Sequence, residues 1–298
     1  PNADCAYGIV EVVDAATGAK QTSFYSGLQS DGMAIHASSA KMYIANTGDS
    51  YVDVVDLTTH ARSKRIDSAT SIEDIIVRPS DGALVVRNRL GGGNSLLLVH
   101  GGSVSDAPSP GNWPTKTLFE RGTNTVHTLS HHESKVSSFD IETLGSISSV
   151  SLGVARLRSD GLSTMALDSS TRKLYVAMPE LGQIVAVDLA TQRAATPVTV
   201  PGFDVAWAEG PGLLQLAVNE RRGRVYLFSP KQLSLFVYDR SLALLRTTVL
   251  PQEATAAAGS MLDGVTSDDA NDRLFLLSMI LDAEGEQVTG SLPDGDRV

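Results

Sequence analysis

Short runs of apolar residues alternate along the chain with turns rich in Gly, Asp, Asn and Ser. The runs are β-branched and aromatic, as in Lys41–Asn46, Lys173–Met178 and Arg224–Ser229, and this composition is typical of β-strands. The longest helix-permissive run, at 254–258, is bounded by Pro251 and Gly259, so that no long helix is expected. The pattern predicts an all-β protein.

The strands recur as a repeated unit. Tyr43, Tyr175 and Tyr226 hold the same place in the three clearest runs, and each run is followed by a turn and a second apolar run. Weaker copies fill the intervals, so that successive copies begin near residues 32, 73, 115, 162, 213 and 262. Steps of 41 to 51 residues match the four-stranded blades of a β-propeller. We therefore predict a β-propeller of about six four-stranded blades.

The two ends of the chain suggest how such a ring closes. Residues 8–14 and 20–25 resemble only the last two strands of a blade, whereas the last copy has no convincing third and fourth strands after residue 280. We expect the N-terminal strands to join the C-terminal blade, because closure removes two exposed sheet edges. Seven blades result if 90–116 or 201–212 contains further strands. Residues 1–280 are then a single domain, and 281–298 an outer strand or a linker-like tail.

An aspartate ends the second run of each clear block, at Asp56, Asp188 and Asp239. Because a carboxylate accepts hydrogen bonds from backbone N–H groups two or three residues further on, we interpret these acids as turn residues.

Charge and cysteine content narrow the function. The chain has 34 acidic and 24 basic residues, a net charge of −10, which argues against binding to nucleic acid. Cys5 is the single cysteine, so the sequence encodes no cysteine-based zinc or iron–sulfur site. No run of 18 apolar residues occurs, and we expect no membrane span.

The runs in residues 41–57 and 173–189 resemble the Tyr-Val-Thr-Asn or Tyr-Val-Ala-Asn core of YVTN-repeat β-propellers, together with the third strand of that family. The resemblance implies a fold and an extracytoplasmic location, secreted or periplasmic, since family members are often found there. Some relatives are fused to electron-transfer domains, and some propellers with similar repeats are lactonases. The motif residues are structural, and no catalytic residue can be transferred from them.

Candidate ligands for a metal ion lie where the first strand of each copy begins. Asp31, Glu73 and Asp263 fall within about one position of each other when the repeats are aligned on their tyrosines. Carboxylates from several blades suit a divalent cation such as calcium, which takes six to eight oxygen ligands. The alternative is that these Asp-Gly sequences only form turns.

Other residues near the same ends are candidate ligand contacts. His36 lies on a first strand, and Trp113 lies in a loop where its ring can stack on a sugar or anchor a partner. The remaining candidates are acidic, namely Asp74, Asp160 and Glu209.

The sequence leaves three functions open. The first is a binding module for a protein, small molecule or carbohydrate, within a longer protein or by itself. The second is a metal-assisted hydrolase of the lactonase kind, and the third is a docking domain for an electron-transfer partner. No nucleophile motif favours catalysis.

Overall fold

A computed structural model describes most of the chain: residues 7–14, 17–28, 30–67, 72–88, 96–100, 103–106, 114–130, 133–154, 164–204, 214–251, 265–276, 279–285 and 287–291. The chain divides into two compact units. The first contains residues 1–12 and 22–148, and the second contains 13–21 and 149–298. In the described residues, the helical elements are 3₁₀ turns, and none has the length and apolarity that a membrane crossing needs.

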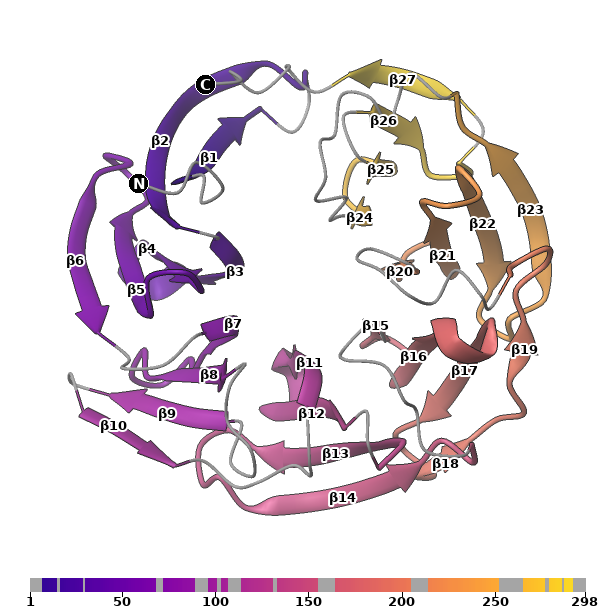
Figure 1. Cartoon of the computed structure of the whole chain (residues 1–298), viewed down its shortest axis with the longest axis horizontal. Coiled ribbons are helices and arrows are strands. Elements are labelled where there is room, and N and C mark those ends of the chain that lie inside the picture. The colour runs from indigo at the N-terminus through magenta and orange to yellow at the C-terminus, as the bar shows by residue number, and fades with distance from the viewer. Residues whose placement is uncertain are drawn as a thin grey trace. The chain divides into compact units, whose positions relative to one another are not determined.

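The described strands form seven antiparallel sheets, in which neighbouring strands follow one another along the chain (Figure 1). Five sheets have four strands each, one has five and one has two. In the first unit, the first of these four-stranded sheets contains β3 (Ser30–His36), β4 (Lys41–Asn46), β5 (Tyr51–Asp56) and β6 (Arg62–Asp67). The next contains β7 (Ile72–Val77), β8 (Leu84–Asn88), β9 (Leu96–His100) and β10 (Ser103–Asp106). The third contains β11 (Pro114–Glu120), β12 (Thr125–Ser130), β13 (Lys135–Asp140) and β14 (Ser146–Ser151).

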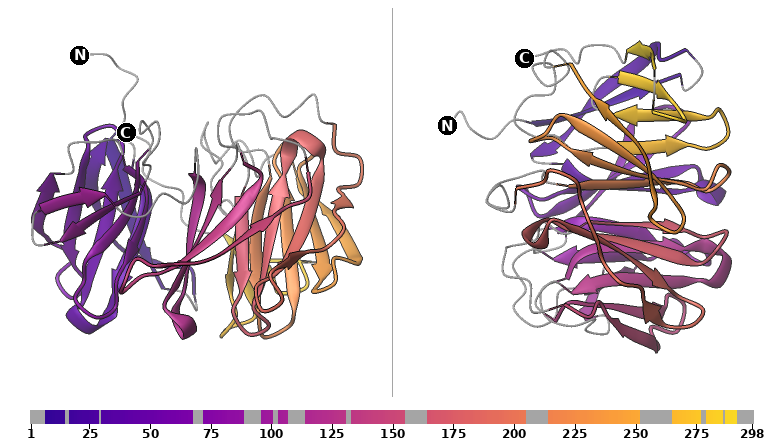
Figure 2. Two further views of the ribbon diagram at one scale, coloured as in Figure 1. Left: turned by 90° about the horizontal axis from the view of Figure 1, so that it is seen from below. Right: turned by 90° about the vertical axis from the view of Figure 1, so that its right-hand side faces the viewer.

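The second unit repeats this arrangement. Its five-stranded sheet contains β15 (Thr164–Asp168), β16 (Lys173–Met178), β17 (Gln183–Asp188), β18 (Arg193–Ala194) and β19 (Val198–Thr199). Two four-stranded sheets follow. They are β20 (Gln215–Asn219), β21 (Arg224–Ser229), β22 (Ser234–Asp239) and β23 (Leu244–Val249), then β24 (Val265–Asp268), β25 (Arg273–Leu276), β26 (Met279–Asp282) and β27 (Val288–Ser291). Figure 2 shows the strands of these sheets from the side.

These bounds confirm the predicted repeat, since each first strand begins within three residues of its expected start. One expectation was wrong. The C-terminal sheet has its own third and fourth strands, β26 and β27, which are only four residues long and carry little pattern. The edge strand β10 ends at Asp106, before the prolines at 108, 110 and 114.

The N-terminal strands β1 (Tyr7–Val13) and β2 (Lys20–Leu28) form the two-stranded sheet. Gly18 in their turn has φ +72, and a residue one or two positions before the fourth strand has the same left-handed backbone at His60, Leu144 and Gln192. The pair therefore corresponds to the last two strands of a repeat, as predicted. Among the described residues, β1 and β2 pair only with each other. Closure of a ring through them, and a count of six or seven blades, stay predictions.

The predicted turn role of the aspartates is confirmed. The Asp56 carboxylate accepts hydrogen bonds from the N–H groups of Thr58 at 2.9 Å and Thr59 at 2.8 Å, and Asp239 accepts one from Ser241 at 2.8 Å. Asp188 accepts one from the N–H of Thr191 at 2.8 Å. These bonds favour the charged carboxylate, and the backbone hydrogen bonds are the main cause that lowers the pKa of Asp56 and Asp188.

The apolar core lies between successive sheets. One cluster joins the sheets β3–β6 and β7–β10 through residues such as Tyr43, Val54 and Val86, and another joins β20–β23 and β24–β27 around Phe228. Second strands such as β4, β16 and β21 are buried along nearly their whole length, which explains their nearly continuous apolar sequence. The fourth strands β6 and β23 are largely exposed; β6 carries mostly charged side chains, whereas β23 also exposes Leu244, Leu245 and Val249.

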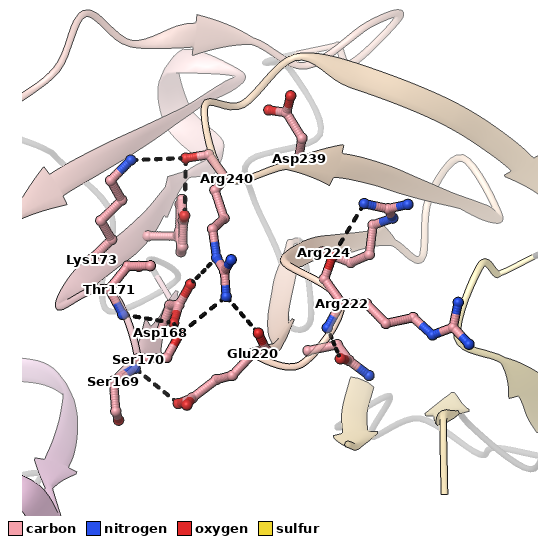
Figure 3. A network of polar contacts seen from close by, with 12 residues as sticks. Asp168, Ser169, Ser170, Thr171, Lys173, Glu220, Arg222, Arg224, Asp239 and Arg240 are labelled. Atoms are coloured by element: carbon pink, nitrogen blue, oxygen red, sulfur yellow. Dashed lines mark hydrogen bonds and ion pairs between the residues drawn. The ribbon is translucent and has the colours of Figure 1, made fainter. Parts of the chain in front are cut away.

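Polar contacts also fasten neighbouring sheets of the second unit to each other (Figure 3). Asp168, at the end of β15, is fully buried, and its carboxylate accepts a hydrogen bond of 2.7 Å from Nε of Arg240, which follows β22. The Arg240 guanidinium also donates to Ser170 Oγ at 3.0 Å and to the carbonyl of Glu220. Burial works to raise the pKa of Asp168, but hydrogen bonds from Ser170 and Arg240 outweigh it and hold that pKa below its usual range.

The tyrosines of the repeat make a second kind of contact between sheets. Tyr175 Oη donates to the carbonyl of Arg240 at 3.1 Å, and Lys173 Nζ donates to the same oxygen at 3.4 Å (Figure 3). Tyr226 Oη likewise donates to the carbonyl of Ala283. In each case the acceptor belongs to the turn between the third and fourth strands of the next sheet.

Candidate ligand-binding site

A cavity in the first unit has a volume of about 690 Å³ and lies along three first strands, β3, β7 and β11. Each of these strands is the edge of its sheet, paired on one side only among the described residues. Strand β7 packs beside both β3 and β11. The cavity therefore combines side chains from three sheets with backbone at strand edges. It is lined at the ends of the strands by the turns that lead to β4, β8 and β12.

Apolar side chains form most of the cavity wall. Met33 and Ile35 alternate along β3 and are 54% and 47% exposed, although both are large and apolar. They face the cavity together with Ile76 and Phe119. Large apolar side chains that remain this exposed inside a concave site are typical of a surface that binds another molecule.

Polar groups are few and lie at one end of the cavity. The His36 ring is held in place at both nitrogens, since Nδ1 lies 2.8 Å from Ser39 Oγ and Nε2 lies 3.2 Å from the carbonyl of Pro79. The Ser38 hydroxyl lies 3.0 Å from Nε2 as well, so two serine hydroxyls and one carbonyl fix the ring. Arg121, by contrast, is exposed, and no hydrogen bond or ion pair joins its guanidinium to a described residue. It is available for a carboxylate or carbonyl oxygen of a ligand.

Of the eight site residues suggested by the sequence, His36 is in this cavity. Asp74 lies on the neighbouring strand β7 but serves the fold, because its buried carboxylate accepts hydrogen bonds from Arg87 Nε and the Thr117 N–H at 3.1 Å each and from Lys116 Nζ at 3.0 Å. Burial is the largest influence on the pKa of Asp74, and it acts to raise that pKa. The charges of Lys116 and Arg87 outweigh it, so the pKa lies below its usual range. Four candidates are outside the described residues, namely Trp113, Asp160, Glu209 and Asp263.

The remaining two, Asp31 and Glu73, lie on described backbone, although their side chains are outside the described part. Both sit where the register of the first strand shifts by one residue, between Ser30 and Gly32 in β3 and between Ile72 and Asp74 in β7. The two acids are thus at equivalent bulges of successive repeats, as their sequence alignment predicts. No group of three or more His, Cys, Asp and Glu side chains in the described part could hold a metal ion. The metal site stays a prediction.

The sequence did not reveal a buried polar triad in the sheet β11–β14. His127 Nδ1 lies 2.8 Å from Ser138 Oγ, and His127 Nε2 lies 3.2 Å from Glu120 Oε2. The order of hydroxyl, imidazole and carboxylate is that of a hydrolase triad. Ser138, Glu120 and His127 are all at most 4% exposed, however, so a substrate cannot reach them inside the sheet. We assign them a structural role.

The cavity also lies at a different place from the one expected. The sequence places ligands where the first strands begin, whereas the polar groups of the cavity lie where β3 and β11 end, at η1 (Ala37–Ser39) and η2 (Arg121–Thr123). The sequence feature that could have located the cavity is the pair of large apolar residues, Met33 and Ile35, at alternate positions of the first strand β3.

No protein-family model matches this sequence, and no curated protein matches it. Solved structures do. The β-propeller domain of Cps50 (Swd1) from Myceliophteria thermophila is 13% identical, with a TM-score of 0.64 over 93% of this chain and 88% of that domain. Hydrazine synthase from Kuenenia stuttgartiensis is also 13% identical, with a TM-score of 0.63 over 85% of this chain and 76% of that chain. With the repeated four-stranded sheets, these matches define a β-propeller. The resemblance to the YVTN-repeat family stays a prediction.

Proposed function

We propose that this β-propeller is a binding module and that it takes up a segment of a partner protein in the cavity along β3, β7 and β11. The observation that carries the proposal is the pair Met33 and Ile35, two large apolar side chains about half exposed inside a cavity of about 690 Å³. An extended segment suits the site because the free edges of three strands offer backbone hydrogen bonds and the cavity offers an apolar wall. By resemblance to YVTN-repeat propellers, we place the protein outside the cytoplasm, secreted or periplasmic.

The charge of the site indicates which segment fits. Arg121 lies at the end of an apolar cavity and has no partner among the described residues, so it favours a ligand oxygen that carries negative charge. We expect a segment with an apolar anchor residue followed closely by an acidic residue.

Selection from a random peptide library on the purified protein tests this. Peptides with that pattern should be enriched, and a Met33→Asp/Ile35→Asp variant should bind them at least about tenfold more weakly, because truncating central contacts commonly costs more than 1.4 kcal/mol. The matched control is Leu244→Asp/Leu245→Asp, which alters two equally exposed apolar residues on β23 that do not line this cavity. Enriched peptides that bind both variants like the wild type would overturn the proposal.

A metal-assisted hydrolase is the second candidate, favoured by the equivalent bulges that carry Asp31 and Glu73. It predicts a stoichiometric divalent ion, such as calcium, in protein purified without chelator. An Asp31→Ala/Asp263→Ala variant should lose the ion, whereas Asp67→Ala, which removes an exposed acid on β6, should retain it. Elemental analysis decides, and a metal-free wild type would rule this candidate out.

A further inference from the structure

A second cavity in the first unit, with a volume of about 250 Å³, shares no lining residue with the first. Its walls are partly apolar, and its polar lining is unusually basic for a chain of net charge −10. The polar residues and the glycine that line it are Lys41, Tyr43, Lys64, Asp81, Gly82 and His100.

Two of these residues hold positions that recur in the second unit. Lys41 and Tyr43 lie on β4 as Lys173 and Tyr175 lie on β16, within the matching sequences of the repeat. The pairing register agrees, because Lys41 lies opposite Asp56 and Lys173 lies opposite Asp188. The two lysine–tyrosine pairs are therefore structurally equivalent.

In the second unit, both members of the pair donate to one oxygen. Lys173 Nζ and Tyr175 Oη converge on the carbonyl of Arg240, at 3.4 and 3.1 Å (Figure 3). The hydroxyl of Tyr226, one repeat later, also meets a carbonyl oxygen of the next sheet. This position of the repeat is arranged to donate hydrogen bonds to oxygen.

In the first unit, no hydrogen bond joins the Tyr43 hydroxyl to a described residue, although Tyr43 is only 7% exposed. The amino groups of Lys41 and Lys64 likewise have no hydrogen bond or ion pair within the described part of the chain. The position that corresponds to Arg240 is Gly101, which is outside the described residues. The Tyr43 hydroxyl is not among the fully buried side-chain atoms that lack a partner, and it lines the cavity, so a bound acceptor can reach it.

The charged side chains around the cavity have a net positive charge. The Asp81 carboxylate is engaged by Arg78, whose Nε and Nη2 donate to it at 2.9 and 2.6 Å. The hydrogen bond from Arg78 is the main cause that lowers the pKa of Asp81 to about 2, so Arg78 balances its charge. Lys41 and Lys64 remain as cations. Burial raises the pKa of Tyr43, so its phenol stays protonated and donates.

We propose that this second cavity binds a small oxyanion, a carboxylate or phosphate group. One of its oxygens accepts the hydrogen bonds of Tyr43 Oη and Lys41 Nζ, in the place that the Arg240 carbonyl holds in the second unit. Lys64 neutralises the remaining charge. Gly82, with φ +74, keeps the wall open, because a Cβ there would lie 3.6 Å from Tyr43 Oη and 3.2 Å from His36 Nδ1. The site is independent of the cavity proposed for partner binding.

Titration calorimetry of the whole protein with inorganic phosphate, sulfate and acetate tests the site, at constant ionic strength set with chloride. We expect saturable binding of at least one of these anions. Tyr43→Phe and Lys41→Gln should each weaken it about tenfold, and Lys41→Gln/Lys64→Gln should abolish it, because hydrogen bonds to a charged group are the stronger class. Tyr43→Phe removes a hydroxyl without a partner, so the variant should unfold at the same denaturant concentration as the wild type.

The matched control is Tyr226→Phe, at the same position of the repeat but with its hydroxyl already bonded to Ala283. It should bind the anion within twofold of the wild type while losing stability. Peptides that carry a glutamate or a phosphoserine show whether the natural oxyanion is part of a peptide. If such a peptide binds more tightly than the free ion, the site recognises a peptide side chain. If both bind equally, the site recognises the free ion. A wild type that binds none of the anions overturns the proposal, and so does binding that survives Lys41→Gln/Lys64→Gln.

Discussion

Replacing Arg240 by alanine should lower the free energy of unfolding by about 2–3 kcal/mol, measured by urea denaturation at pH 7. The substitution leaves the fully buried Asp168 carboxylate without its cation and removes the hydrogen bonds to Ser170 and Glu220. Loss of one partner from a buried ion pair costs about 3–5 kcal/mol. We expect a smaller loss of unfolding free energy for Arg240→Ala, because the Arg240 side chain is 36% exposed and water screens part of the interaction.

The loss of unfolding free energy in Arg240→Ala should depend on pH. The pKa of Asp168 is below its usual value in the folded protein, so the contact stabilises the fold above the unfolded pKa of about 3.9 and stops doing so as the pH falls through the folded pKa. Without Arg240, the pKa of Asp168 rises. The difference between wild type and Arg240→Ala should therefore be largest near neutral pH and shrink below about pH 4.

Two variants separate this contact from a general effect of charge. Arg221→Ala removes an exposed arginine whose nearest ion pair, with Asp272, is 3.6 Å, and should cost no more than about 0.5 kcal/mol. Arg240→Ala/Asp168→Asn removes both charges and should be less destabilised than the sum of the single variants. A deficit for Arg240→Ala that is the same at pH 7 and pH 4 would contradict the role of the charge.

Replacing Glu120 by alanine should destabilise the protein by about 3 kcal/mol. Glu120 and His127 are 2% and 1% exposed, so Nε2 of the imidazole loses an acceptor that water cannot replace. The same carboxylate oxygen also accepts from Thr123 Oγ1 at 2.7 Å, at the turn η2 before β12. The substitution thus removes a partner in the sheet and one in the turn.

Glu120→Gln keeps the shape and some of the hydrogen bonds, and should cost clearly less than Glu120→Ala. The surface control is Glu133→Ala, which breaks an ion pair with Lys135 and should cost at most about 1 kcal/mol. Urea denaturation of the three variants measures these differences in the free energy of unfolding. If the free energy of unfolding of Glu120→Ala lies within about 1 kcal/mol of the wild-type value, the contact between Glu120 and His127 does not stabilise the sheet.

Local features of the fold could be predicted because they depend on neighbours in the sequence. Asp56 and Asp188 accept hydrogen bonds from N–H groups only two or three residues away, so their role can be read from the local pattern. Strands such as Lys41–Asn46 are buried on both faces and appear as continuous apolar runs. Strands β26 and β27 were missed because four residues with mixed polarity carry too little pattern.

The candidate sites depended on contacts that no local pattern contains. His36 lines the first cavity, and Phe119 on β11 and Arg121 in the turn η2 reach the same cavity from about eighty residues further along the chain. Asp74 as a ligand contact stays a prediction, and the pattern could not show that Lys116, on the first strand of the next sheet, donates a hydrogen bond to its carboxylate.

The sequence by itself determined the repeat: the strand order, the turns and the shared position of Tyr43, Tyr175 and Tyr226. These follow from hydrogen bonds and burial within some fifty residues. Only the tertiary structure decided what each copy does, because the partner of a repeat position comes from the neighbouring sheet. Tyr175 meets the carbonyl of Arg240, 65 residues away, whereas Tyr43 faces a basic cavity. The same local sequence thus closes a contact between sheets at Tyr175, whereas at Tyr43 no hydrogen bond joins the hydroxyl to a described residue.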